Sequence, residues 1–208
     1  MFKRILIVAS TLILALGILL ISVFRSASVK YVFSQGPETQ QTTSDEEMKI
    51  DYTLPYPGRV FPDGPLWPLK ALRDKLWLIL NTNPTREAEL NLLFADKRIA
   101  MSKALFERDK AEIAFSTLSK SEKYLEEAYN LEEQNRKNGI DTSEFLTALS
   151  KASLKHREMI DEILKIAPED AKPEIIKMQD YSKSVYNKTR DALQEKGLPI
   201  IENPFESE

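Results

Sequence analysis

The chain has 208 residues, with 29 Lys and Arg, 32 Asp and Glu, one His and no Cys. The absence of cysteine excludes disulfides, thiolate catalysis, Cys-ligated zinc or iron–sulfur clusters, and lipid attachment through a thiol. A single histidine argues against a His-rich metal site or a Ser-His-Asp triad, and only six glycines argue against phosphate-binding glycine loops and all-β folds.

The first predicted element is an uncharged run of twenty residues at 5–24. As a helix it would span roughly 30 Å, the thickness of a bilayer core. Lys3 and Arg4 precede the run and favour a cytoplasmic N-terminus. We therefore expect a cytoplasmic end at 1–4, a transmembrane signal anchor at 5–24 and an extracytoplasmic remainder, which makes a single-pass protein of the cell membrane. The alternative is a signal peptide cleaved near Ser26-Ala27-Ser28.

Residues 25–50 are predicted to form a flexible linker, since the stretch 34–47 has no aliphatic residue and is rich in Gln, Thr, Ser and acid. A coil of this length spans roughly 25–30 Å. Residues 45–208 hold 25 basic and 31 acidic residues, a net charge of about −6. This charge makes nucleic acid a poor partner, and it gives no reason to expect electrostatic docking on anionic lipid.

The next region, residues 51–197, is predicted to be an all-α domain, a bundle of about five antiparallel helices. The proline-rich stretch 55–68 should lead in extended form into the first helix, which Asp63 or Gly64 can cap. Leucines then recur at a spacing of three and four residues and form an apolar stripe on this helix. They are Leu66, Leu69, Leu72, Leu76 and Leu80.

Four further helices are expected at residues 85–107, 110–137, 142–166 and from the Pro168–Pro173 turn to 196. Asn83-Pro84 and Asn138-Gly139 are typical helix breaks, and Asp141 to Glu144 reads as a capping box. The short connections favour antiparallel neighbours. Residues 198–208 are expected to be a loose tail.

The proline-rich stretch resembles the signature of an uncharacterised family, a domain of unknown function in exported or membrane-anchored proteins of bacteria and archaea. The resemblance rests on a PYPG motif at 55–58 and on the run PDGPLWPLK at 62–70, where the family more often has Ser and Tyr at Gly64 and Trp67. It extends through helical segments from Leu54 to Leu193. The resemblance implies an all-helical, envelope-facing domain and brings no known activity.

Three aromatic residues, Phe61, Trp67 and Trp77, are the candidate partner-binding residues, because Trp is favoured at interface hot spots. The alternative is that Trp67 holds the proline-rich stretch against the bundle. His156 lies in an apolar row of its helix, which favours a hydrogen-bonded core histidine over a ligand or an acid–base role. No catalytic, cofactor-binding or metal-ligating residue is assigned, and no cofactor is expected.

These observations predict a non-catalytic scaffold or adaptor that holds a protein partner at the cell envelope. Two alternatives stay open. A sensor would bind a small ligand in an apolar cavity between helices. A metal-dependent hydrolase would need carboxylates such as Asp63, Glu89 and Asp96 to converge in a pocket.

Overall fold

The computed structural model describes residues 11, 14–15, 17–18 and 50–205. The expected signal anchor at 5–24 lies mostly outside these residues, as do the cytoplasmic end at 1–4, all of the linker except Ile50, and residues 206–208. No helix among the described residues is long and apolar enough to cross a membrane.

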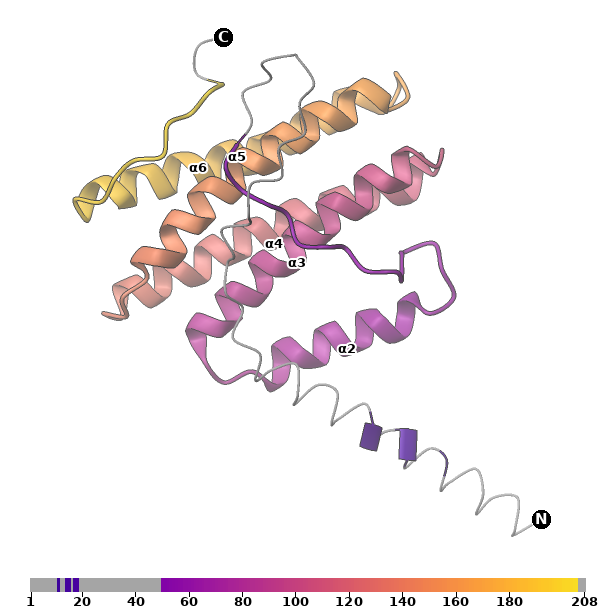
Figure 1. Ribbon diagram of the computed structural model, residues 1–208, viewed down its shortest axis with the longest axis horizontal. Helices are drawn as coiled ribbons and strands as arrows, with labels where there is room; N and C mark the ends of the chain where they lie inside the picture. Colours follow the sequence, from indigo (N-terminus) through magenta and orange to yellow (C-terminus); the bar gives the residue numbers. More distant parts are fainter. Residues whose placement is uncertain (1–10, 12–13, 16, 19–49, 206–208) are drawn as a thin grey trace.

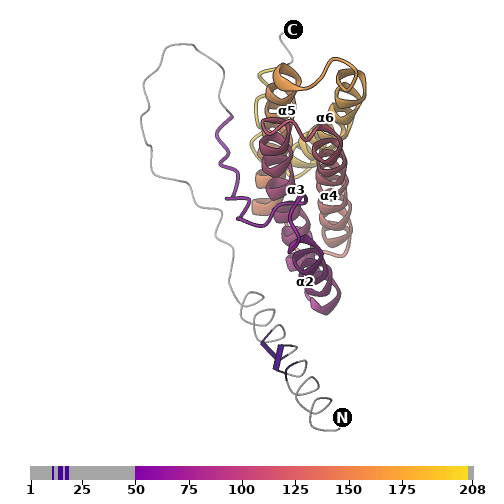
Figure 2. The ribbon, with the colours of Figure 1, turned by 90° about the vertical axis from the view of Figure 1, so that its right-hand side faces the viewer.

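Residues 50–205 contain five helices and no strand, so the expected all-α fold is confirmed. The helices are α2 (Trp67–Leu80), α3 (Pro84–Phe106), α4 (Ala111–Lys137), α5 (Ser143–Ile166) and α6 (Lys172–Glu195). The main helix contacts are between α3 and α4 and between α5 and α6, and the two pairs pack together through α4–α6 and α3–α5. Figures 1 and 2 show this four-helix body, with α2 set apart at its edge.

Local sequence signals account for most helix ends. The side chain of Asn83 accepts hydrogen bonds from the backbone N–H groups of Thr85 and Arg86, and Pro84 occupies the first position of α3. Gly139 follows α4 with φ +80°, a left-handed conformation that glycine adopts without strain. The predicted breaks at these two places are confirmed.

One predicted cap is not formed, and another is formed only in part. The helix α2 begins at Trp67 without a side-chain cap, and the carboxylate of Asp63 pairs with Lys110 instead. Before α5, the carboxylate of Asp141 accepts the backbone N–H of Ser143 at 3.1 Å, as half of the predicted capping box requires. Thr142 makes no capping hydrogen bond, and its hydroxyl donates to the buried carboxylate of Glu132 on α4 at 2.7 Å.

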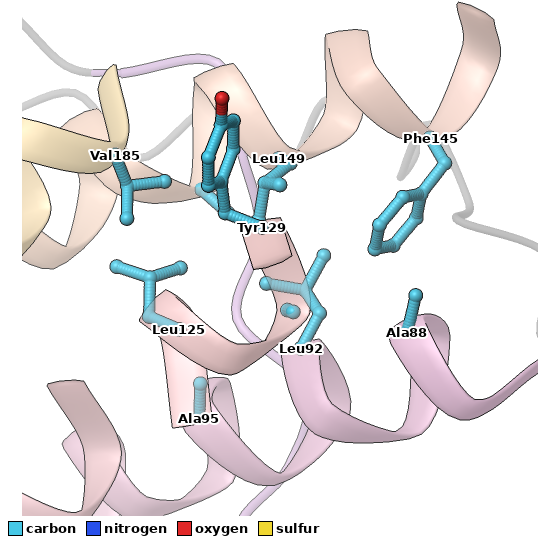
Figure 3. Packing of buried hydrophobic residues seen from close by; sticks show 10 residues of the cluster. Ala88, Leu92, Ala95, Leu125, Tyr129, Phe145, Leu149 and Val185 are labelled. Carbon is cyan, nitrogen blue, oxygen red and sulfur yellow. The ribbon is translucent and has the colours of Figure 1, made fainter. Parts of the chain in front are cut away.

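The core forms where α3, α4, α5 and α6 meet (Figure 3). Side chains from all four helices interdigitate there, and the small residues of α3 allow close approach of its neighbours. The cluster includes Ala88, Leu92, Ala95, Leu125, Tyr129, Phe145, Leu149 and Val185. Ala88, Leu92 and Ala95 of α3 recur at a spacing of four and three residues, so they lie on one side of the helix, and that side faces the core.

The segment after α6 packs on the bundle, which corrects the expectation of a loose tail for its described part. The hydroxyl of Tyr186 donates to the backbone carbonyl of Ile201 at 2.7 Å, and Ile201 also packs against Leu193. The guanidinium of Arg157 lies 4.3 Å from the ring centre of Phe205. The apolar residues of this segment bury surface on α5 and α6, so the ordered domain extends to 205 rather than ending near 197.

The leucine stripe of α2 points away from the bundle. Leu66, Leu69, Leu72 and Leu80 are all exposed, and Leu76 is only half-buried. The one buried residue of the helix is Asp74, whose carboxylate is bound by Arg73 at 2.7 Å. The helix therefore turns its apolar side outward.

Candidate functional site

The centre of the bundle holds a buried group of three ionisable side chains, here called the buried triad. His156 on α5 lies between Asp96 on α3 and Glu122 on α4. Its Nδ1 is 2.7 Å from Glu122 Oε1, and its Nε2 is 3.1 Å from Asp96 Oδ1. All three side chains are almost completely buried. The triad therefore connects three helices through charge-assisted hydrogen bonds.

The proline-rich side of the domain adds a fourth partner to the triad. The hydroxyl of Tyr52 donates to Asp96 Oδ2 at 2.7 Å. Glu122 Oε2 has no hydrogen-bond partner among the described residues, although it is buried. An oxygen without a hydrogen bond at the centre of a core lowers the stability of the fold. The hydrogen bonds of the other triad atoms and the packing around them must therefore offset this cost.

The charge state of His156 follows from its neighbours. Burial alone lowers the pKa of an imidazolium, but the charge of Glu122 and the hydrogen bonds to Asp96 and Glu122 outweigh burial and raise the pKa of His156 to about 9. Both ring nitrogens then donate to carboxylates. The imidazole consequently has no lone pair to offer a metal or a substrate.

The triad does not line the two surface hollows described below. Of the three acids considered for a hydrolase, Asp63 pairs with Lys110, and Glu89 pairs with Arg86 at 2.8 Å. Asp96 alone belongs to the triad, where it contacts His156. Among the described residues, no group of three or more His, Asp or Glu is arranged to hold a metal ion.

A second feature lies where α2, α3 and α4 meet. The guanidinium of Arg98 on α3 is surrounded by aromatic rings, 4.4 Å from the ring centre of Tyr124, 5.5 Å from Phe94 and 5.9 Å from Trp67. Arg98 is 7% exposed. Its Nη1 donates to the carbonyl of Phe94 at 3.3 Å, and its buried Nε has no hydrogen-bond partner among the described residues. Burial lowers the pKa of Arg98, whereas the charges of Tyr124 and Asp74 act in the opposite direction. Asp74 on α2 is thus the nearby counter-charge of Arg98, although it forms its ion pair with Arg73.

Beside Arg98 the surface forms a hollow of about 380 Å³, here called the Arg98 hollow. Trp67 and Pro62 form its apolar wall on the proline-rich side. Residues of α4 complete it, with Lys120 as a second cation and Glu112 as the one acid. A smaller hollow of about 200 Å³ lies between α5 and α6, lined by Ser153, Arg157, Lys183 and Tyr186 among others. Neither is the enclosed apolar cavity that a sensor of apolar ligands would need.

The three candidate aromatic residues do not share one surface. Trp67 lines the Arg98 hollow and also lies under Lys70 Nζ, 5.3 Å from the ring centre. Trp77 is half-buried and packs on Phe94, with ring centres 6.2 Å apart. Phe61 packs elsewhere, against the core cluster around Leu105 and under the guanidinium of Arg108 at 4.3 Å.

Sequence reasoning placed His156 in the core but missed its two partners. A signal was present, because both acids interrupt apolar rows. Asp96 lies between Leu92 and Ile99 at a spacing of four and three, and Glu122 lies in the same way between Leu118 and Leu125. An acid in an apolar row needs a buried partner, and the one histidine in an apolar row was available.

Comparison with known proteins supports the family resemblance in its general form. A family model described as a domain of unknown function matches residues 59–170, a shorter range than the 54–193 inferred from the sequence. No curated protein matches the chain, and no solved structure does. The family match includes α2 to α5, the buried triad and the Arg98 hollow, and it covers more than half of the chain. The chain therefore belongs to the DUF5667 family of domains of unknown function.

Proposed function

We propose that this protein is a membrane-anchored, extracytoplasmic scaffold or adaptor without catalytic activity. In this proposal the Arg98 hollow binds an acidic segment of a protein partner in the cell envelope. The observation that carries the proposal is the guanidinium of Arg98, buried beside an open hollow and without a carboxylate partner.

A buried cation without a direct ion-pair partner is a costly arrangement. Asp74 compensates Arg98 only at longer range and is itself paired with Arg73, so an incoming carboxylate in direct contact would lower that cost further. A planar guanidinium is a favoured hydrogen-bond partner of carboxylates, and among the described residues Arg98 makes one hydrogen bond, from Nη1 to the Phe94 carbonyl at 3.3 Å. Trp67 adds a large apolar surface at the same place. Trp and Arg are the residue types most enriched at interface hot spots, so this pair suits a protein partner.

The predicted signal anchor supports the adaptor part of the proposal. A domain held on a linker that spans roughly 25–30 Å stays within a short distance of the membrane surface, where the domains of other membrane proteins are also confined. Such tethering raises the effective concentration of a partner without any new contact. A moderate affinity at the hollow would therefore be sufficient for stable association.

Two exposed residues of α4 provide a test, because reversing the charge of one should weaken partner capture and reversing the charge of the other should strengthen it. We expect Lys120→Glu to reduce partner capture about two- to fivefold and Glu112→Lys to increase it by a similar factor, because rim charges contribute up to about 1 kcal/mol each. Capture is measured by a photo-crosslinking residue at the exposed Ser116 of the full-length chain in its native membrane. The matched control is Lys137→Glu at the other end of α4, which should leave capture unchanged.

The hollow is not the partner site if crosslinking from Ser116 yields the same products in all three charge variants. The proposal would also be overturned if Lys120→Glu and Glu112→Lys changed capture in the same direction. All three positions are exposed to solvent, so none of the changes should unfold the domain. Glu112→Lys and Lys137→Glu each place an unfavourable charge at an end of α4, and Lys137→Glu also removes the ion pair with Glu133, so both should lower the unfolding temperature slightly, and it is measured for every variant beside capture. Loss of capture through loss of folding is thereby separated from loss through charge.

The anchor itself predicts the mass of the mature protein. Protein purified from the native membrane should have the full mass of 23.8 kDa, because an uncleaved anchor keeps residues 1–28. The measurement is mass spectrometry of the intact chain. A chain shorter by about 28 residues would show a cleaved signal peptide and contradict the anchor.

A further inference from the structure

The outer side of α2 carries a continuous apolar surface that the bundle leaves uncovered. Ile79 is 66% exposed, Leu69 is 58% exposed and Leu72 is 51% exposed. At 100° per residue, five leucine and isoleucine side chains lie within about 60° of the direction opposite the buried Asp74. They are Leu69, Leu72, Leu76, Ile79 and Leu80, here called the outer face of α2.

A contiguous apolar face of this kind is unusual on the surface of a soluble protein. Scattered exposed leucines need no explanation, but contiguous apolar patches mark a place where something else binds. Elsewhere in the described residues the exposed large aliphatic side chains of α3 to α6 are isolated, as Ile113, Ile166 and Ile176 show. The helix is also joined to the bundle mainly through Trp67, Trp77 and Leu78 on its inner side. The outer face is therefore left open to a partner.

The charges beside the outer face indicate what that partner is. Arg73 and Lys75 flank the apolar face on its two sides, and Lys70 lies further round the helix. The single acid, Asp74, is buried and bound by Arg73. The net charge of α2 is thus +2, from three basic residues and one acid, on a chain whose net charge is −3. Lys75 is the exposed basic residue of the helix, since Lys70 and Arg73 are half-buried. Leucines on one side with Lys and Arg along the border are typical of a helix that lies in the headgroup region of an anionic bilayer.

We propose that α2 docks on an anionic lipid surface, with its outer face at the boundary between headgroups and acyl chains. Lys75 lies at the phosphates, and Arg73 borders the other side of the face while it keeps its pair with Asp74. The net charge of the domain hides this local property, which is why overall charge gave no reason to expect it. The expected anchor at 5–24 and its linker would keep α2 within reach of the same membrane. This surface differs from the Arg98 hollow, so either proposal can fail without the other.

A second copy of the chain is a weaker explanation of the same face. Pairing two outer faces would bring the Arg73 and Lys75 side chains of both copies together along the border. Like charges at such positions oppose association. An anionic bilayer instead offers a negative charge to each of them, worth roughly a fivefold gain in binding per cation.

The absence of cysteine from the chain gives a direct test. The full-length protein with Leu72→Cys carries a nitroxide label and is reconstituted into vesicles of phosphatidylcholine with or without phosphatidylglycerol. Collisions with oxygen and with a water-soluble nickel complex report the depth of the label. We expect the label roughly 5–10 Å below the phosphate level in the anionic vesicles. The matched control is Ile176→Cys on α6, equally exposed at 52%, which should stay in water.

Charge variants separate lipid docking from general hydrophobic adsorption. Lys75→Gln should lower the ratio of docked to undocked label about fivefold in anionic vesicles, whereas Lys75→Arg should leave it unchanged. Lys75 is exposed, so neither variant disturbs the core. Both measurements use the label at Leu72→Cys and the same two vesicle compositions.

Three results would overturn the proposal. The first is a label at Leu72→Cys that is as accessible to nickel as the control at Ile176→Cys in both kinds of vesicle. The second is protection of the label that rises with protein concentration and does not depend on lipid charge, which indicates a second copy. The third is protection in native membranes but not in pure lipid, which indicates a protein partner. Crosslinking from Ser116 is unaffected by the Leu72→Cys change and reports the function of the hollow separately.

Discussion

Replacing His156 with leucine is expected to lower the free energy of unfolding by about 3–5 kcal/mol at pH 7. The change removes the cation that lies between Asp96 and Glu122, at 3.1 Å and 2.7 Å, and leaves two carboxylates facing each other in the core. A domain of this size is stable by only about 5–15 kcal/mol, so the loss is a large fraction of the total. Urea denaturation followed by circular dichroism measures it.

Ser153→Ala is the matched control for this change. Ser153 is also fully buried on α5, one turn before His156, but its hydroxyl donates only to the carbonyl of Ser150 at 2.7 Å. Losing that local hydrogen bond should cost about 1 kcal/mol. If His156→Leu cost no more than Ser153→Ala, the triad would not be a significant source of stability.

A triple variant shows whether His156→Leu loses stability because two carboxylates are left unpaired or because the imidazole no longer fills its space. His156→Leu combined with Glu122→Leu and Asp96→Asn removes every charge of the triad and keeps an acceptor for the hydroxyl of Tyr52. Replacing a buried ionic group by well-packed apolar residues is often neutral. The triple variant should therefore recover most of the stability that the single variant loses, and it keeps the test possible if His156→Leu fails to fold.

Helix positions were predictable from the sequence because their signals are local. Asn83-Pro84 starts a helix and Gly139 ends one through contacts within a few residues, and the structure has both. The start of α2 was not predictable to the same degree, because Asp63 binds Lys110 instead of capping the helix. At α5 the local signal held in part, since Asp141 accepts the Ser143 N–H while Thr142 binds Glu132 on α4. Contacts between different helices and loops are not encoded in a short motif.

The sequence shows which residues share one side of a helix, but it does not show which way that side faces in the fold. Periodicity groups Leu69, Leu72 and Leu76 on one side of α2, but it does not say whether that side meets a core or a solvent. The side opposite contains Asp74, whose burial with Arg73 allows α2 to turn the leucines outward. The triad posed a related problem, because its members come from three helices. Which of their faces meet depends on how the helices are rotated about their axes, and no short motif encodes that.

The buried triad also predicts how stability depends on pH. The pKa of His156 is about 9 in the folded protein against an ordinary value of 6.5. The folded state therefore holds a proton that the unfolded state releases, so the stabilisation is complete below pH 6.5 and is lost as pH rises through 9. The full contribution corresponds to about 3 kcal/mol, since one pKa unit equals 1.36 kcal/mol. About half of it should disappear between pH 6.5 and pH 8.

Lys70 has the opposite effect on the pH dependence of stability from that of His156. Its effect begins near pH 8, so the loss of stability due to His156 is seen most clearly below that pH. Burial lowers the pKa of Lys70 to about 8, and its ammonium donates to the carbonyls of Pro57 and Val60. A lysine with a lowered pKa makes the folded state gain stability with rising pH above 8, which offsets part of the loss from His156. Lys70→Arg keeps the cation and the donors but does not titrate in this range, so it should make the decline between pH 8 and pH 9 steeper.

The measurement is the free energy of unfolding from urea titrations at half-unit steps between pH 6 and pH 9.5. The parent chain should lose stability steadily from pH 6.5 to pH 8, and the triple variant without the triad should be flat over the same interval. A decline of equal slope in the triple variant would assign the pH dependence to another group. A flat parent chain would mean that His156 is neutral between its carboxylates. Because both ring nitrogens lie within hydrogen-bond distance of a carboxylate oxygen, the imidazolium is the form that satisfies both, and the decline is the expected result.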